Sequence, residues 1–418
     1  MEKRKERAVA VGLNVSDRGI DIHSDDTTLA ELAALIETAG GEVVLSVIQN
    51  RETPDPATFI GAGKAAEIRK AAEDLEADIV VFDNELSPSQ MKNLEAELDL
   101  PVLDRTGIIL DIFASRAFTA EGKLQVELAQ YKYLLPRLSG QGKNLSRQGA
   151  TGGNPIGTRG PGETKLETDR RHIRERIAKL RRDADDIRRV RGEQRRRREK
   201  NGMPLVALVG YTNAGKSTIL NLLTGAGVSA NNRLFDTLDP TTRVFKPSEK
   251  TEALLTDTVG FIRDLPHHLV DAFRATLEEL SFADLVLIVS DISDENREEQ
   301  TRVTEKLVSE LCGEDTPRLY VLNKADLCPE NVPFEGDDYV CISARTGENV
   351  DRLLQKIAAV LEKKKIRFRI LLPYGESARL DKLYKEGAVA GTEYTDNGII
   401  VEGECDDKLY GTVKEYGI

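Results

Sequence analysis

The stretch that decides the fold is LVALVGYTNAGKST, residues 205–218. An apolar run typical of a buried strand leads into Gly210, and a helical pattern begins at Ser217. Gly210, four free positions, Gly215, Lys216 and Ser217 match the phosphate-loop pattern G-x-x-x-x-G-K-[ST]. Because the strand and the helix are the context that this motif requires, the sequence predicts a P-loop nucleotide-binding domain.

The chemistry of phosphate binding explains the spacing of this motif. Gly210 and Gly215 allow the backbone to curl so that successive N–H groups point at the α- and β-phosphates. The helix that follows adds the partial positive charge of its N-terminus. Lys216 is expected to reach the β- and γ-phosphate oxygens, and the Ser217 hydroxyl is expected to bind Mg²⁺.

The composition describes a chain of several domains. Its 418 residues are 40% apolar and 31% charged, without Trp, which is typical of a helix-rich globular protein. No apolar run approaches the ~20 residues that span a bilayer, and the N-terminus MEKRKERAVAV lacks the apolar core of a signal peptide. The four cysteines have no C-x-x-C spacing. We therefore expect a cytoplasmic protein with free thiols.

The net charge of −12 argues against a protein that is basic throughout, although local basic segments can still bind nucleic acid. Upstream of about residue 105 the sequence alternates strand and helix patterns. This β-α-β-α order predicts a small parallel sheet with right-handed crossovers. The expected strands are residues 8–13, 43–48, 79–82 and 102–103, and the expected helices are residues 29–38, 64–75 and 88–98.

Two helical seams follow this region. Matching seams on two helices joined by a loop predict an antiparallel helical hairpin. The first seam is Leu124, Leu128, Tyr131 and Leu135, and the second is Ile173, Ile177, Leu180, Ala184 and Ile187.

The loop between these helices, residues 139–162, is long and rich in glycine. It carries Lys143, Arg147 and Arg159 and no acidic residue. A loop of this length is either functional or disordered, and its charge favours a cationic finger that contacts phosphate or RNA over a plain connector. The arginine run 195–198 would offset the helix dipole and can add to such a contact.

Two further motifs follow the phosphate loop in the order that a GTPase requires. In TDTVG, residues 256–260, Asp257 is placed to hold Mg²⁺ and the Gly260 N–H to meet the γ-phosphate. In NKAD, residues 323–326, the Asp326 carboxylate can accept two hydrogens from guanine, a pair that adenine does not offer. The aliphatic part of the Lys324 side chain can lie over the guanine ring. Backbone N–H groups of residues 343–345 can reach guanine O6.

A switch loop lies between these motifs, in LFDTLDPTTR at residues 234–243. One threonine hydroxyl of such a loop binds Mg²⁺ and is released on hydrolysis, and spacing does not choose among Thr237, Thr241 and Thr242. Phe261 occupies the position where Ras-type GTPases carry the glutamine that orients the attacking water. Because a phenyl ring cannot orient water, we expect slow hydrolysis by the isolated protein.

These motifs resemble the HflX branch of the Obg–HflX GTPases. The resemblance rests on GYTNAGKST, LFDTLDPTTR, DTVGFIRDLP and NKAD, and on longer stretches upstream of the GTPase motifs. Those stretches are FIGAGKAAEI, VLDRTGIILDIFASRAFTAEGKLQVELAQYKYLLPRL and GTRGPGETKLETDRRHIRERI. Related Obg-type proteins bind Mg²⁺ through the threonine before Leu-x-Pro, which implies Thr237, with Thr241 as the second choice.

The resemblance implies a ribosome-associated GTPase that binds the large subunit and its rRNA and splits or rescues stalled ribosomes. The ribosome is then expected to stimulate hydrolysis, and the helical hairpin with its loop would face the ribosome. We expect a monomer that uses Mg²⁺. A GTPase of ribosome assembly or RNA modification is the alternative, and a scaffold with vestigial nucleotide binding is a third reading that the complete motif set disfavours.

The predicted fold is α/β, with four parts. These are a small parallel α/β domain (1–115), a helical hairpin (116–200), a GTPase domain (201–364) and a small C-terminal α/β domain (365–418). Lys216, Gly260 and Thr237 are the candidate catalytic residues, and Ser217, Thr237 and Asp257 the candidate metal ligands. The candidate GTP-binding residues are Gly210, Tyr211, Thr212, Asn213, Ala214, Gly215, Lys216, Ser217, Thr218, Phe235, Asp236, Thr237, Leu238, Asp239, Asp257, Thr258, Val259, Gly260, Asn323, Lys324, Ala325, Asp326, Ser343, Ala344 and Arg345.

Overall fold

A computed structural model describes residues 4–16, 24–138, 161–200, 203–227, 234–239, 241–249, 251–263, 279–313, 316–328, 336–363, 366–405 and 407–418. The chain divides into two compact units. The first unit holds the described residues up to Ile187 together with the segment Leu234–Asp239. The second unit holds the other described residues from Arg188 onward.

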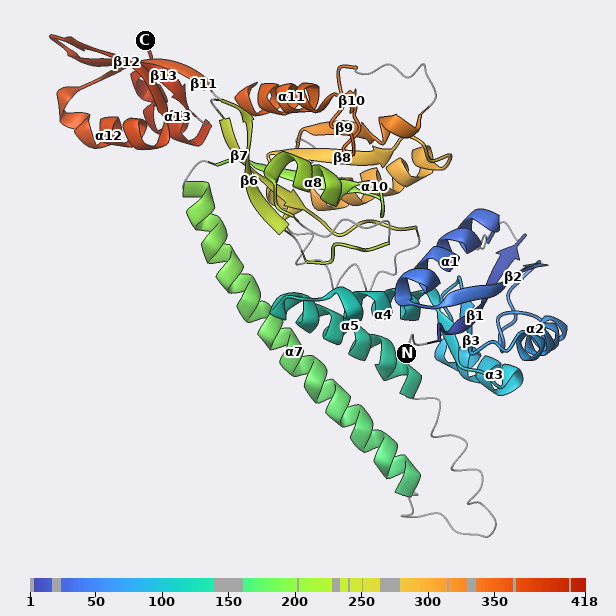
Figure 1. Cartoon of the computed structure of the whole chain (residues 1–418). Coiled ribbons are helices and arrows are strands. Elements are labelled where there is room, and N and C mark those ends of the chain that lie inside the picture. The colour runs from blue at the N-terminus through green and yellow to red at the C-terminus, as the bar shows by residue number, and fades with distance from the viewer. Residues whose placement is uncertain are drawn as a thin grey trace. The chain divides into compact units, whose positions relative to one another are not determined.

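The first unit begins with a four-stranded sheet that is parallel, as the sequence predicted, and whose strand order is β2-β1-β3-β4. Helices α1 and α4 lie together on one face of this sheet, and α2 and α3 lie together on the other (Figure 1). The elements are β1 (Arg7–Val15), α1 (Asp26–Ala39), β2 (Glu42–Arg51), α2 (Ala62–Asp74), β3 (Ile79–Phe82), α3 (Pro88–Leu98), β4 (Val102–Asp104) and α4 (Arg105–Arg116).

Helix α4 is the element of this sheet domain that the sequence analysis missed. Its N-cap is Asp104, whose carboxylate accepts the Gly107 N–H at 2.9 Å. The same carboxylate accepts the Tyr133 hydroxyl at 2.7 Å and pairs with Arg137 at 2.8 Å. Buried Arg105 pairs with Asp83 at 2.7 Å. These buried hydrogen bonds and ion pairs fix α4 to both the sheet and the following helix.

The helical hairpin consists of α5 (Ala120–Arg137) and α7 (Pro161–Lys200), of which residues up to Ile187 belong to the first unit. The predicted seams share one apolar cluster as far as Leu180, while Ala184 and Ile187 of the second seam lie outside it. Helices α5 and α7 run side by side (Figure 1), which confirms the hairpin within the described residues. Arg176 of α7 also pairs with Glu127 of α5 at 2.6 Å. The residues in this shared apolar cluster are Leu124, Leu128, Tyr131, Leu135, Ile173, Ile177 and Leu180.

The second unit is built on a six-stranded sheet in the order β10-β9-β8-β5-β7-β6. Each pair of neighbouring strands in this sheet is parallel, except that β6 runs antiparallel to β7. The elements are β5 (Leu205–Gly210), α8 (Lys216–Thr224), β6 (Thr241–Ser248), β7 (Thr251–Asp257), β8 (Leu285–Asp291), α10 (Arg297–Leu311), β9 (Arg318–Asn323), β10 (Tyr339–Cys341) and α11 (Val350–Lys363).

Two apolar layers cover the two faces of this sheet. Helices α8 and α11 contribute to one layer, in which Ile219 and Leu353 pack against Leu208 of β5. Helix α10 contributes Val308 to the other layer, which meets Val209 of the same strand. Strand β5 is therefore buried on both sides, and its continuous apolar sequence reflects that position.

The chain ends in a three-stranded antiparallel sheet in the order β11-β13-β12. One face packs against helices α12 and α13 through a core that includes Ile370 and Val401. These strands and helices are β11 (Ile366–Leu372), α12 (Ser377–Glu386), β12 (Ala388–Thr395), β13 (Gly398–Cys405) and α13 (Asp407–Val413). The predicted C-terminal α/β part is present.

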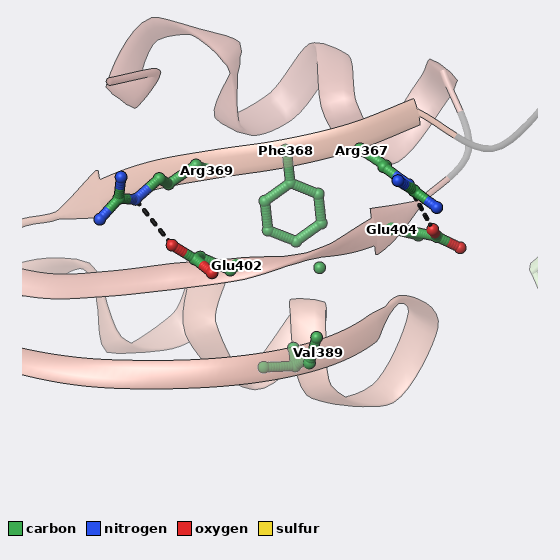
Figure 2. A pocket seen from close by; sticks show the side chains of 8 residues that line it. Arg367, Phe368, Arg369, Val389, Glu402 and Glu404 are labelled. Atoms are coloured by element: carbon green, nitrogen blue, oxygen red, sulfur yellow. Dashed lines mark hydrogen bonds and ion pairs between the residues drawn. The ribbon is translucent and has the colours of Figure 1, made fainter.

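The ion pairs Arg367–Glu404 at 2.9 Å and Arg369–Glu402 at 2.7 Å join β11 to β13 along a shallow hollow (Figure 2). All four side chains are exposed, and exposed pairs contribute at most about 1 kcal/mol each. The apolar core beneath the sheet therefore supplies most of its stability.

All four cysteines are free, as the sequence predicted. Among the residues that the structure describes, none of the helices combines the length and the apolar character needed to cross a membrane.

Candidate nucleotide-binding site

The phosphate-loop stretch forms the predicted strand, loop and helix, in β5, residues 211–215 and α8. Close packing explains both of its glycines. A Cβ on Gly210 would lie 2.2 Å from the Val289 carbonyl oxygen, and a Cβ on Gly215 would lie 2.1 Å from Nδ2 of Asn323. Gly215 also has a φ of +94°, a backbone region that favours glycine. The loop therefore has the shape that a phosphate-binding backbone needs.

Lys216 supplies the cation of this loop. Its side chain is buried, and Nζ donates hydrogen bonds to the carbonyl oxygens of Gly210 at 3.1 Å and Tyr211 at 2.8 Å. Burial lowers the pKa of Lys216 to about 8, although the nearby Asp257 carboxylate opposes this shift. A phosphate anion beside this ammonium would restore the charged form.

The candidate metal ligands of the second unit lie together. The Ser217 hydroxyl, at the start of α8, donates a hydrogen bond of 2.7 Å to Oδ2 of Asp257, at the end of β7. Parallel pairing of β5 with β7 sets this geometry, because it places Asp257 opposite Leu208 of the phosphate-loop strand. A carboxylate and a hydroxyl are hard oxygen donors of the kind that Mg²⁺ prefers, so these residues fit that ion.

The TDTVG motif is joined to the phosphate loop through its backbone. The Thr212 N–H donates to the Phe261 carbonyl oxygen at 2.8 Å, and the Phe261 N–H donates to the Gly210 carbonyl oxygen at 3.0 Å. The Thr258 hydroxyl donates to the Leu208 carbonyl oxygen at 2.8 Å. These bonds hold the end of the motif against the loop that would carry the phosphates.

Gly260 is enclosed by this arrangement, because a Cβ there would lie 2.9 Å from the Thr212 Cα atom. The next side chain, Phe261, is fully buried and packs with Val209 and Leu280. The ring is therefore a core residue of the second unit. This position agrees with the sequence-based conclusion that Phe261 does not orient the attacking water.

The predicted base-recognition residues come together at the carboxyl ends of β9 and β10. Asn323 donates from Nδ2 to the Ala214 carbonyl oxygen at 2.9 Å, and its Oδ1 accepts the Ala344 N–H at 3.0 Å. The Ser343 hydroxyl donates to Oδ1 of Asp326 at 2.6 Å. Asn323 thus connects the phosphate loop to residues 343–345, and Ser343 orients the carboxylate proposed to read guanine.

Asp291 is a residue of this region that the sequence analysis missed. It ends β8, and its Oδ2 pairs with Lys324 Nζ at 2.5 Å, while its Oδ1 accepts the Ser293 N–H at 3.0 Å. Lys324 has a φ of +66°, in the left-handed region, and the ion pair holds the end of its side chain. Asp291 follows the apolar run of β8, and this position is the sequence signal that could have identified it. Ligands bind beyond the carboxyl ends of parallel strands, so a polar residue there is a candidate.

The candidate switch residues Phe235, Asp236, Thr237, Leu238 and Asp239 belong to the first unit. Thr237 is 9% exposed. The two alternatives to Thr237 lie in β6 of the second unit, where Thr241 pairs with Asp257 in the sheet register. The Thr242 hydroxyl donates to the Thr256 hydroxyl at 3.1 Å. The choice of Thr237 stays a prediction.

The three cations of the loop between the hairpin helices, Lys143, Arg147 and Arg159, lie outside the described residues.

Comparison with known proteins identifies the family. Residues 26–114 match the family described as GTP-binding GTPase N-terminal, and residues 116–198 match GTP-binding GTPase Middle Region. Residues 205–324 match the family described as 50S ribosome-binding GTPase. GTPase HflX of Caldanaerobacter subterraneus is 46% identical over 98% of this chain and 93% of its own length.

The chain belongs to the GTPase HflX family. GTPase HflX of Lacrimispora saccharolytica is 44% identical over 99% of this chain and 97% of its own length, and that of Escherichia coli is 42% identical over 87% and 86%. A GTP-binding protein from Sulfolobus solfataricus, solved in complex with GDP, is 24% identical with a TM-score of 0.43 and covers 86% of this chain and 99% of its own. As an HflX-family member, this chain is a GTPase with an α/β fold.

Proposed function

We propose that this HflX-family GTPase acts on the large ribosomal subunit in the cytoplasm, as a monomer, and splits or rescues stalled ribosomes. The match of residues 205–324 to the 50S ribosome-binding GTPase family is the observation that carries the ribosomal part of the proposal. GTP–Mg²⁺ would order the switch segment, and hydrolysis would release the ribosome. Hydrolysis would be slow until the ribosome supplies the water-orienting group, since Phe261 is buried in the core.

The pocket roles follow from the same proposal. The phosphate loop would hold the phosphates with Lys216, and Ser217 and Asp257 would hold Mg²⁺ together with Thr237. Mg²⁺ would supply charge neutralisation at the β- and γ-phosphates. Asp326 would read guanine, with Asn323 and Ser343 holding the surrounding loops in place. The division into four parts at residues 115, 200 and 364 belongs to the proposal as well.

Cosedimentation with purified ribosomal subunits tests this function. The chain is incubated with 50S, 30S or 70S particles and GMPPNP, GDP or no nucleotide, and the pellet is quantified. We expect retention on 50S subunits with GMPPNP and loss of retention with GDP. Lys216→Ala should abolish nucleotide binding, and with it the difference in retention between GMPPNP and GDP. Equal pelleting in all three nucleotide conditions would contradict a nucleotide-controlled ribosome factor.

The basic loop is tested with a triple substitution, Lys143→Ala, Arg147→Ala and Arg159→Ala. If the loop contacts rRNA, the variant should bind 50S subunits more weakly, and its affinity should depend less on salt. The matched control removes three exposed lysines elsewhere, Lys70, Lys306 and Lys414. Unchanged binding by the loop variant would refute the contact. Stimulation of hydrolysis by protein-free RNA as strong as by ribosomes would favour the RNA-modification alternative.

A further inference from the structure

The segment Leu234–Asp239 comes from the GTPase part of the sequence but belongs to the first compact unit. Within that unit it contacts the end of α4 and the start of α5. We call residues 113–122 of this junction the elbow. The elbow and the segment both lie within the first unit.

An aromatic side chain anchors the start of the segment. Phe235 is buried, and its ring packs edge-on against Phe113 of α4, with ring centroids 4.7 Å apart and planes at 78°. Phe235 has a φ of +55°, which is unfavourable for a residue with a bulky side chain. The packing therefore holds the backbone in a conformation that it would not keep alone.

Two carboxylates complete the attachment. Asp236 pairs with Arg116 at the end of α4, at 3.5 Å, and both side chains are largely buried. Asp239 uses both of its oxygens on the start of α5. Oδ2 accepts the backbone N–H groups of Phe118 at 2.9 Å and Thr119 at 2.8 Å, and Oδ1 accepts the Thr119 hydroxyl at 2.5 Å.

The sequence at the start of α5 leaves room for the Asp239 carboxylate. Thr119 is the N-cap of α5, and its hydroxyl oxygen accepts the Gly122 N–H at 2.9 Å. Glycine is a poor helix former, yet a Cβ on Gly122 would lie 2.2 Å from Oδ1 of Asp239. The absent side chain at residue 122 leaves the space in which the Asp239 carboxylate sits.

We propose that the elbow is the receptor for the switch segment and that it preorganises Thr237 for GTP–Mg²⁺. Phe235 and Asp236 are anchored before Thr237 and Asp239 is anchored after it, so the elbow fixes the segment on both sides of the candidate ligand. GTP–Mg²⁺ would still order Thr237 itself, but an anchored segment has less conformational freedom left to lose than an unanchored one, so preorganisation lowers the cost of binding. Phe113, Arg116 and Thr119 then act as positioning residues. The inference rests on the proposed role of Thr237.

The test is Gly122→Ala in the full chain, because the added Cβ displaces Asp239 while alanine favours the helix. Affinities for GMPPNP and GDP are measured in Mg²⁺ buffer. We expect the Kd for GMPPNP to rise about tenfold, a typical size of coupling between sites. The Kd for GDP should stay within about twofold, because the switch threonine is recruited only by the γ-phosphate.

The matched control is Gly63→Ala, in the first turn of α2, where a Cβ would meet no atom within 4 Å. A second variant, Asp239→Ala, removes the carboxylate without touching α5. Hydrogen exchange reports directly whether the switch segment has detached from the elbow. The amides of Phe118 and Thr119 would lose their acceptor, the Asp239 carboxylate, and should exchange faster in both variants.

Unchanged or tighter GMPPNP binding by variants whose Phe118 and Thr119 amides are released would overturn the proposal. Thr237→Ala separates this outcome from a failure of the proposed function. If Thr237→Ala weakens GMPPNP binding and the elbow variants do not, Thr237 binds the metal without help from the elbow. If the unsubstituted chain binds neither nucleotide, the proposed function fails as well.

Discussion

The Ser217 hydroxyl donates a hydrogen bond of 2.7 Å to Oδ2 of Asp257, which brings a phosphate-loop residue and the TDTVG carboxylate to one point. Strand pairing rather than sequence proximity creates this contact, because β5 and β7 are parallel neighbours. The two oxygens form part of a site that suits a hard divalent cation.

Asp257→Asn should therefore weaken GMPPNP binding in Mg²⁺ buffer by about tenfold to a hundredfold, because a neutral amide is a poorer ligand than a carboxylate. Binding of GDP in EDTA should change little. Titration of a fluorescent analogue in both buffers measures the difference. Glu252→Gln, which removes an exposed carboxylate from the same strand, is the control. Equal Mg²⁺ dependence of Asp257→Asn and the unsubstituted chain would contradict the metal assignment.

Nucleotide binding should take up a proton above pH 8. Burial lowers the pKa of Lys216 from its ordinary value of 10.5 to about 8, and bound phosphates would raise it again. Below pH 8 the ammonium is charged in both the free and the bound protein, so affinity should not depend on Lys216 titration. Above pH 8 the free protein loses this proton while the complex keeps it, so GDP affinity should fall by about tenfold per pH unit.

Calorimetric titration of GDP at pH 9 checks this expectation. Two buffers with different ionisation enthalpies should give different apparent binding enthalpies, and the difference reports proton uptake. The same pair of buffers at pH 7 is the control. Identical enthalpies at pH 9 would show that Lys216 keeps its charge in the free protein.

Asp326→Asn should change the base that the pocket accepts. An amide presents one donor and one acceptor in place of two acceptors, which matches xanthine better than guanine. The Ser343 hydroxyl donates a hydrogen bond to the Asp326 carboxylate. Because it can donate the same bond to an amide oxygen, the asparagine side chain should keep the position of the native carboxylate. We expect GTP binding to weaken at least about a hundredfold and xanthosine triphosphate binding to improve. Competition titrations with both nucleotides measure the switch, and an unchanged preference for GTP would place base recognition elsewhere.

Phe261→Gln should not create a fast GTPase, although it installs the residue type of Ras-type enzymes. The native ring is fully buried among Val209, Leu280 and Ile288, so the amide would lie in an apolar core without partners. Thermal denaturation should show lower stability, and single-turnover assays should show no acceleration of hydrolysis. Phe261→Leu, which keeps the site apolar, should lose less stability. Faster hydrolysis by Phe261→Gln would show that residue 261 reaches the nucleotide.

Much of the fold could be predicted because its signals are local. Alternation of strand and helix patterns identified the parallel sheet of β1 to β4, and the seams identified the hairpin of α5 and α7. Helix α4 was missed because its sequence is apolar on most sides, with Ile108, Ile109 and Ile112 all buried. A helix buried between a sheet and another helix has no simple amphipathic period.

The sequence alone determined the phosphate loop, the TDTVG motif and the NKAD motif, because each is a short run whose spacing follows from the chemistry of phosphate, Mg²⁺ or guanine. The tertiary structure decided which distant groups support them. Asp291 meets Lys324 only because β8 and β9 are neighbours, and Asp239 meets Thr119 across 120 residues of chain. Contacts of this kind depend on strand order and helix packing, so no local pattern contains them.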